Sequence, residues 1–242
     1  LKSLRVGAGI GSSVGPWRDV NYNYIITNPL YIGENNQLET LELAEGIETI
    51  GQKALTNCSE YGVGSGYAHL TTLILPTTLK EVGRDAFDGT PVRNLVFKGN
   101  GTVGSDAFYG NTALESVTIE GGTIGNYAFE GCTNLKTVTL GEGVTSIGYH
   151  AFYGCTSLTS LSVPDSVTVY GAGMIQGCSA LKSLRVGAGI GSSVGPWSDV
   201  NYNYMITNPL YIGENNQLET LELAEGIETI GQEALTNYRE YG

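Results

Sequence analysis

Cysteine is the residue type with the most regular placement among those that could do chemistry in this sequence. Cys58, Cys132, Cys155 and Cys178 each lie three residues after a large apolar residue of a repeated motif. The last three are 23 residues apart, so in a stacked β structure they would be about 5 Å apart along the axis. A structural zinc site usually needs closely spaced cysteine pairs, which are absent, and a disulfide between adjacent rungs demands a specific dihedral angle. We therefore expect a buried column of free thiols and no metal site.

Two glycine-rich segments match catalytic or cofactor-binding motifs by letter only. Residues 11–15 match Gly-x-Ser-x-Gly, but a nucleophile elbow requires a following helix and a histidine partner. The two histidines, His69 and His150, lie in different repeat units without an obvious carboxylate constellation. Residues 99–104 match a dinucleotide fingerprint, but no long amphipathic helix follows to hold a pyrophosphate. We expect no enzyme and no cofactor, and the remaining enzymatic alternative is a hydrolase acting at the aromatic insertion described below.

The charge balance excludes one class of partner. The chain has 24 acidic and 12 basic residues and a formal net charge of −12, whereas nucleic-acid binding needs a basic stripe. No apolar run approaches the ~18 residues of a membrane span. Clustered glutamates are expected to form a solvated face that keeps the protein soluble. They are Glu39, Glu42, Glu45 and Glu48, repeated at Glu219, Glu222, Glu225 and Glu228.

A short repeat positions all of these residues. Each unit begins with Leu-x-x-Leu/Val-x-Leu/Val/Ile, continues with a second short apolar segment, and ends at a Gly-x-x-Ala-Phe turn. The units start at Leu1, Leu38, Leu70, Val92, Leu114, Leu135, Leu158, Leu181 and Leu218. Compact units of 21 to 23 residues are within the leucine-rich-repeat range and too short for two-helix repeats. Since one unit cannot bury its apolar residues alone, we predict an α/β, β-rich solenoid of about nine coils, with short strands and 3₁₀ or helical-turn corners.

A longer period lies above the short one. Residues 1–62 match residues 181–242 with five differences, at an offset of 180 residues or seven coils. We interpret 1–242 as a single solenoid domain and as a fragment of a longer array. No polar capping unit is evident at either end, and end-to-end self-association through the uncapped ends is therefore expected as a further mode of assembly.

Alternation assigns the faces of the first strand in each unit. Val138 and Leu140 should point inward, whereas Thr137 and Thr139 should point outward. The outward column consists mainly of Ser and Thr, which favours cross-strand pairing that supports the sheet, with a flat recognition surface as the alternative. The inward column should contain Leu73, Leu95, Val117, Val138 and Leu161. A second buried stack at the corner should contain Phe87, Phe108, Phe129 and Phe152.

An insertion enlarges the first coil between residues 7 and 37, and its copy enlarges the eighth. The compact coils place their large residues in the core and show Ser and Thr outside, but the insertion is rich in large aromatic residues. Such side chains dominate interface hot spots, so we predict a ligand-binding surface there; the alternative is that the rings fill a wider coil interior. The candidates are Trp17, Tyr22, Tyr24, Tyr31, Trp197, Tyr202, Tyr204 and Tyr211.

Residues 135–158 closely resemble the BspA-type leucine-rich repeat of bacterial and protist surface proteins. The resemblance rests on Leu-x-x-Val-x-Leu, Val-Thr-Ser-Ile-Gly-x-x-Ala-Phe-x-Gly-Cys and the next leucine, and it covers the whole chain. It implies a curved solenoid with a parallel sheet, extracellular exposure, and a role in adhesion or host-protein binding, without catalytic residues. The enlarged coils at 7–37 and 58–69, and Tyr238 in the cysteine column, depart from the pattern.

These observations favour a non-catalytic, surface-exposed binding or adhesion module that recognises a protein or glycan. The alternative is a structural spacer that holds another domain away from the cell.

Overall fold

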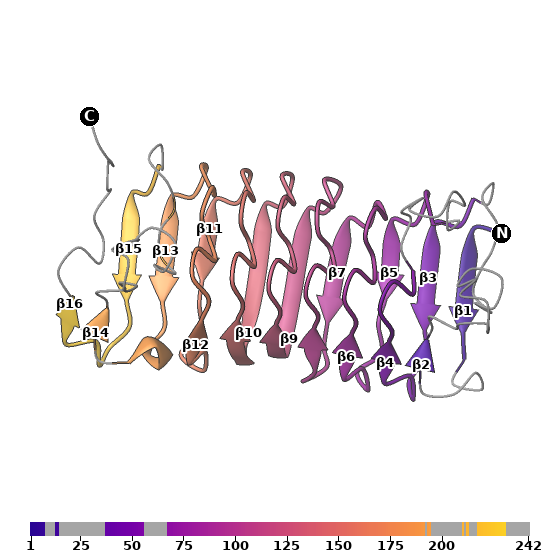
Figure 1. The fold of residues 1–242 in the computed structure, drawn as a ribbon, viewed down its shortest axis with the longest axis horizontal. Coiled ribbons are helices and arrows are strands. Elements are labelled where there is room, and N and C mark those ends of the chain that lie inside the picture. Colours follow the sequence, from indigo (N-terminus) through magenta and orange to yellow (C-terminus); the bar gives the residue numbers. More distant parts are fainter. Residues whose placement is uncertain are drawn as a thin grey trace.

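The computed structural model describes residues 1–7, 13–14, 37–55, 67–191, 193–194, 210, 212 and 217–230. They form an elongated stack of parallel strands, with the first coils at one end and the last at the other (Figure 1). Most strands belong to one sheet of 14 strands. In the part of the chain that the structure describes, no helix is long and apolar enough to cross a membrane.

Nine strands, one from each coil, form the main ladder of this sheet, which confirms the β-rich solenoid and its nine units. In spatial order they are β1 (Ser3–Val6), β3 (Thr40–Leu43), β5 (Thr72–Ile74), β7 (Asn94–Phe97), β9 (Ser116–Ile124), β10 (Thr137–Ile147), β11 (Ser160–Ser162), β13 (Ser183–Val186) and β15 (Thr220–Leu223). Every neighbouring pair is parallel because each coil returns the chain to the same edge before the next strand begins.

A second ladder of shorter strands continues the same coils. It contains β2 (Ser13–Val14), β4 (Thr49–Ile50), β6 (Glu81–Val82), β8 (Thr102–Val103) and β12 (Val169–Tyr170). The strands β9 and β10 are long enough to contribute to both ladders. Near the C-terminus, β14 (Ser193–Val194) pairs with β16 (Thr229–Ile230) as a separate two-stranded sheet.

Hydrogen-bonded turns, rather than helices, form the corners of the compact coils. Backbone amides reach across to the next coil, as from Phe108 to the carbonyl of Ala128 at 2.9 Å and from Phe129 to that of Ala151 at 2.8 Å. Among the described residues the single 3₁₀ helix is η2 (Ala188–Ile190). The residue before the corner alanine has a φ between 51° and 57° in five coils: Lys53, Asp85, Asp106, Tyr127 and His150.

The predicted phenylalanine stack is present and fully buried. Ring centroids are 4.9 Å apart for Phe87 and Phe108, 5.5 Å for Phe108 and Phe129, and 5.4 Å for Phe129 and Phe152, with interplanar angles of 13°, 11° and 5°. This stack runs along the axis and closes one corner of the core. Phe108 and Phe129 therefore each join their own coil to both neighbouring coils.

The predicted strand register is also confirmed. Leu95 aligns with Val117, which in turn aligns with Val138, and Thr137 and Thr139 are exposed. One detail differs, because Val138 and Leu140 pack against the core but are only partly buried. On the side of the following coil, β10 pairs with β11 through Thr137 and with β12 through Ser146 and Ile147.

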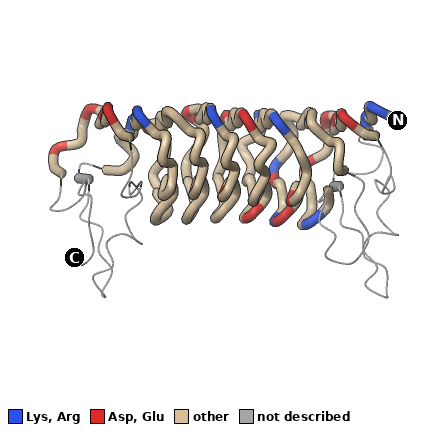
Figure 2. Tube along the Cα trace, turned by 90° about the horizontal axis from the view of Figure 1, so that it is seen from above, with Lys and Arg blue, Asp and Glu red and all other residues tan. Residues whose placement is uncertain are grey.

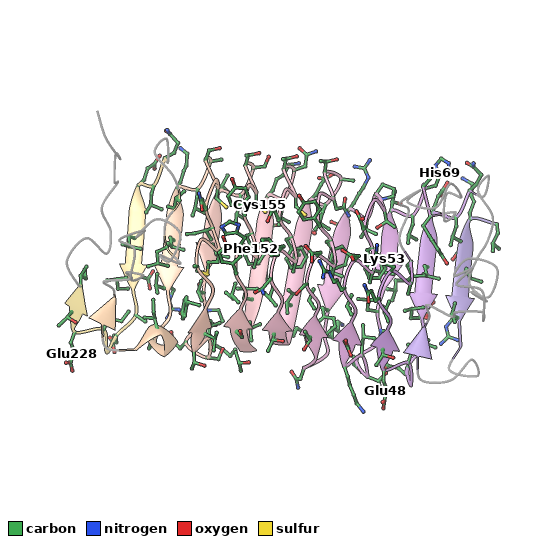
Figure 3. The ribbon with its side chains drawn as sticks, viewed as in Figure 1. Glu48, Lys53, His69, Phe152, Cys155 and Glu228 are labelled. Atoms are coloured by element: carbon green, nitrogen blue, oxygen red, sulfur yellow. The ribbon has the colours of Figure 1, made fainter. Side chains whose placement is uncertain are left out.

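The glutamates predicted to solvate the surface also connect coils. Glu39 pairs with Lys2 at 2.7 Å and Glu48 with Lys80 at 2.9 Å. Figure 3 shows Glu48 and its counterpart Glu228 at the same long edge of the solenoid, towards opposite ends. Such exposed pairs contribute little to stability individually.

Candidate functional site

All eight aromatic residues predicted as a binding surface lie outside the described residues. They are Trp17, Tyr22, Tyr24, Tyr31, Trp197, Tyr202, Tyr204 and Tyr211. Their role in ligand binding stays a prediction.

The cysteine column is structural. Each Sγ–H donates to the backbone carbonyl of a phenylalanine in the preceding coil at 3.3 Å: Cys132 to Phe108, Cys155 to Phe129 and Cys178 to Phe152. These three cysteines are buried and free, whereas Cys58 lies outside the described residues. Figure 3 shows Cys155 near Phe152, between the long edges of the solenoid. Burial raises the pKa of Cys132 and of Cys178 to about 12, so these groups are thiols rather than reactive thiolates.

The outward face of the main ladder is a hydroxyl surface. One row across the nine strands contains Ser3, Thr40, Thr72, Asn94, Ser116, Thr137, Ser160, Ser183 and Thr220. The Ser116 hydroxyl donates to Oδ1 of Asn94 at 2.6 Å, which supports the interpretation that this row stabilises the sheet. In the adjacent row Ile74 is 47% exposed and Val96 is 41% exposed.

The corners of the compact coils carry a different surface, which sequence reasoning missed. Large polar-tipped residues flank the buried Ala-Phe pair in three successive coils, and we call this group the corner patch. It contains Tyr109, Tyr127, Glu130, Tyr149, His150 and Tyr153. The expectation that the compact coils show Ser and Thr outside therefore holds for the strands but not for the corners.

Four rings of the corner patch, from two neighbouring coils, pack against one another: Tyr127, Tyr149, His150 and Tyr153. His150 stacks on Tyr149, with centroids 3.8 Å apart and an interplanar angle of 14°, and on Tyr153 at 4.7 Å and 23°. Tyr127 approaches Tyr149 edge-on at 5.3 Å. Because aromatic pairs of this kind add stability beyond their buried area, the rings hold each other in place.

The position of His150 depends on its backbone and on the next coil. Its φ of 51° lies in the left-handed region, which is unfavourable for a bulky residue. The ring extends over Gly173, where an added Cβ would come within 2.7 Å of the histidine Cδ2. A glycine at that point, itself at a φ of 59°, makes room for the imidazole.

Glu130 is the charged centre of the corner patch. Among the described residues its buried Oε2 has no hydrogen-bond partner, and Nδ1 of His150 lies 3.9 Å away, beyond hydrogen-bond distance. Burial, and to a lesser extent the charge of Asp106, raises the pKa of Glu130. Burial lowers the pKa of His150, opposed by a hydrogen bond with the Gln176 side chain, so the imidazole does not supply a compensating charge at neutral pH.

An acidic segment with one guanidinium continues the surface towards the N-terminus. Nε of Arg84 is 3.2 Å from Oδ2 of Asp106 and 3.6 Å from Oδ2 of Asp85. Figure 2 shows charged residues at the corner edge of the coils nearer the N-terminus, whereas the described corners after residue 147 carry no Asp, Glu, Lys or Arg. The corner patch lies at this transition, with Glu130 beside aromatic rings.

A signal for the corner patch was present in the sequence. Its residues occupy the variable positions of Gly-x-x-Ala-Phe-x, as in Gly148 to Tyr153. Strand alternation does not apply at a turn, so the sequence pattern does not indicate whether the side chains at these positions point inward or outward. Among the described residues, no three or more His, Cys, Asp and Glu side chains are arranged to hold a metal ion.

The repeat architecture agrees with a known family. The sequence matches the BspA type Leucine rich repeat region, in six copies, over residues 31–122 and 101–193. The chain belongs to this family. Family membership and the solenoid together support a binding or structural role for the BspA-type repeats.

Solved structures with similar repeats come from several bacteria. A leucine-rich repeat protein of T. pallidum is 20% identical, with a TM-score of 0.46 over 76% of this chain and 69% of its own. The pneumococcal vaccine antigen PcpA is 14% identical, with a TM-score of 0.42 over 92% of this chain and 75% of its own. A leucine-rich cell surface protein of Faecalibacterium prausnitzii is 14% identical, with a TM-score of 0.38 over 100% and 83%. No curated protein matches the chain.

Proposed function

We propose that this chain is a non-catalytic binding module of a cell-surface protein, and that it recognises a protein or a glycan. The observation that carries the proposal is the corner patch, in which aromatic side chains with polar tips gather on three adjacent coils. Tyr109 is 46% exposed, and the other patch residues are partly buried. Aromatic residues of this type provide large contact areas at low entropic cost and dominate interface hot spots.

The scaffold under the corner patch supports the same proposal. Phe108, Phe129 and Phe152 are fully buried beneath it, and backbone hydrogen bonds join every corner to the next. A surface fixed in this way loses little conformational freedom on binding, which favours affinity. Location at the cell surface is typical of the BspA-type family.

A structural spacer is the second candidate function. The elongated ladder and the duplication of residues 1–62 at 181–242 are compatible with a stalk of repeating coils. A spacer needs no preferred partner, whereas a binding module does. The two functions therefore differ in whether the isolated chain retains a specific ligand.

The test is retention of partners on the immobilised full chain. Purified extracellular matrix proteins and a glycan array are applied to the wild type and to three variants. Tyr149→Ala changes the corner patch, Ile74→Ala the strand face, and Trp17→Ala combined with Trp197→Ala the aromatic insertion. Retention that falls only with Tyr149→Ala places binding at the corner patch. Absence of saturable retention for every matrix protein and glycan would favour the spacer.

Self-association through the ends of the solenoid stays a prediction. Among the described residues, β1 pairs only with β3, and β15 pairs only with β13. Unpaired strand edges are templates for pairing with another chain. Light scattering over a range of concentrations should show a rising mass if the ends associate, and a constant monomer mass contradicts the prediction.

A further inference from the structure

The strands β15 and β16 have an outer side with which no other strand of the described residues pairs. On the inner side, β15 pairs with β13 and β16 pairs with β14. Figure 1 shows both strands at the end of the described ladder that lies opposite β1. We call the outer side of residues 217–230 the outer edge. Unpaired backbone groups along a strand are templates for pairing with another polypeptide segment.

The second coil contains the same sequence with its edge covered. Residues 37–50 and 217–230 are identical. In the second coil, β3 pairs with β5 and β4 pairs with β6, so the coil formed by residues 70–91 covers both strands of this segment. The protein therefore shows which kind of structure fits an edge with the sequence of the outer edge.

The burial of matching side chains differs between the covered edge and the outer edge. Leu41 and Ile50 of the covered edge are completely buried, each with 0% exposure. Their counterparts in the outer edge are Leu221, which is only partly buried, and Ile230, which is 53% exposed. Because the removal of apolar surface from water is favourable, a coil that covers the outer edge gains free energy from these side chains.

A carboxylate of the covered edge binds the turn of the next coil. Oε1 of Glu45 accepts a hydrogen bond from the amide of Thr77 at 3.0 Å. Oε2 accepts one from the Thr77 hydroxyl at 3.0 Å and one from the amide of Thr78 at 3.2 Å. Glu225 is the counterpart of Glu45, and its side chain is exposed. A turn with two successive threonines is therefore a partner that the outer edge can recognise.

A second carboxylate adds a preference for a basic residue after this turn. Glu48 pairs with Lys80 at 2.9 Å, and its counterpart Glu228 is exposed. The first coil of a second copy offers neither group, because residues 7–11 are Gly-Ala-Gly-Ile-Gly where residues 76–80 are Pro-Thr-Thr-Leu-Lys. A coil with the Thr-Thr turn and the lysine therefore fits the outer edge better than the first coil of a second copy.

We propose that the outer edge is a docking surface for a leucine-rich-repeat coil of the type formed by residues 70–91. The coil adds in parallel register, with its first strand on β15 and its second strand on β16. The threonines of its turn bind Glu225, and its lysine binds Glu228. Strand addition of this kind gains affinity from main-chain hydrogen bonds and specificity from side chains. The outer edge is separate from the corner patch, and the proposal does not depend on the binding function proposed above.

The test uses a fluorescent synthetic peptide with the sequence of residues 67–91, titrated into the full-length chain and followed by fluorescence anisotropy. We expect saturable binding of one peptide per chain. The comparison ligand carries N-methyl groups on Lys80 and Gly83, whose amides donate to the carbonyls of Glu48 and Ile50 in the covered edge, both at 2.7 Å. Loss of two hydrogen bonds should weaken binding by at least about tenfold. Absence of saturable binding, or equal binding of both peptides, overturns the proposal.

A pair of matched variants locates the bound peptide on the chain. Leu221 in β15 and Leu4 in β1 occupy the same ladder position in the last and the first described strands of the main ladder, and both are partly buried against the core. Leu221→Asp should weaken binding of the peptide by at least about tenfold, because the incoming coil would bury the new charge. Leu4→Asp should leave the affinity unchanged. Equal weakening by both variants refutes the outer edge as the docking surface, and circular dichroism checks that both variants fold.

Charge reversal tests the register without a change in the core. Since Glu228 is exposed, Glu228→Lys should leave the fold intact and weaken binding of the peptide by a few-fold, in keeping with the modest strength of exposed ion pairs. A peptide with Lys80→Glu should regain affinity for this variant. Failure of the second change to compensate for the first contradicts the proposed register.

A second copy of the chain is the competing occupant of the outer edge. Light scattering of the chain with and without the peptide distinguishes the two. A chain that stays monomeric and binds one peptide supports the proposal. A dimer that forms without the peptide and persists at saturating peptide concentration shows that a second copy covers the edge, and it refutes the proposal.

Discussion

Replacing Phe129 by alanine tests whether the corner stack holds the solenoid together. The ring is fully buried and lies between Phe108, at 5.5 Å and 11°, and Phe152, at 5.4 Å and 5°. Truncation removes the ring and leaves a cavity with hydrogen-bonded backbone on each side. The corners are fixed by cross-coil bonds such as that from the Phe129 amide to Ala151, 2.8 Å long, so the cavity has little freedom to collapse.

The expected loss of stability follows from this geometry. Large-to-small substitutions of buried phenylalanine cost about 3–5 kcal/mol, with higher values where the site cannot relax. The loss of two ring pairs also favours the upper half of that range, about 4–5 kcal/mol. For a chain of this size each kcal/mol lowers the melting temperature by about 2–4 °C, which gives a decrease of about 8–20 °C. Because coils contact only their neighbours, the unfolding transition should also broaden or split.

Urea and thermal unfolding monitored by circular dichroism provide the measurement. Tyr109→Ala is the matched control, since it removes an aromatic ring from an adjacent coil at a position that is 46% exposed. That control should cost less than about 1 kcal/mol, in keeping with surface substitutions. If the two variants lose equal stability, or if Phe129→Ala melts with the wild type, the stack is not the element that couples the coils.

Three further predictions follow from individual positions. Gly110→Ala should lower the free energy of unfolding in urea by about 1–2 kcal/mol, and Gly122→Ala should lower it by several times as much. Both glycines have positive φ, but an added Cβ overlaps the Gly101 carbonyl only at position 122. Equal losses of stability would contradict that close approach. Because Cys155 is buried and its burial raises its pKa well above the usual value, a thiol reagent should modify Cys155 only at the rate of unfolding. Rapid labelling of Cys155 itself in the folded chain, located by peptide mapping, would refute its burial. Desolvation raises the pKa of Glu130 in the folded state above its ordinary 4.5, so ionisation of this side chain opposes folding. As pH rises through the pKa of Glu130 in the folded state, the melting temperature of the wild type should therefore fall relative to that of Glu130→Gln. A difference in melting temperature that does not change with pH would contradict the raised pKa.

The architecture could be predicted because its causes are local in the repeat. Apolar alternation at Val138 and Leu140 gives the inward face, and the short period makes isolated coils unable to bury it. The Phe129 and Cys155 columns follow directly, since residues at equal repeat positions must stack when the coils do. The partial exposure of Val138 could not be predicted, because alternation assigns the face of a side chain but not how completely the neighbouring coils cover it.

The sequence by itself determined which positions form the corner of each coil, and that Tyr127, Glu130 and His150 occupy variable positions there. Only the tertiary structure decided that these residues, from neighbouring coils, meet in one patch, and that Oε2 of Glu130 has no hydrogen-bond donor among the described residues. The physical reason is that the period sets which positions stack along the axis, whereas contacts between different columns depend on the turn geometry. In this protein that geometry includes the left-handed backbone of Tyr127 and His150, at φ of 57° and 51°, which turns their side chains towards the rings of adjacent coils.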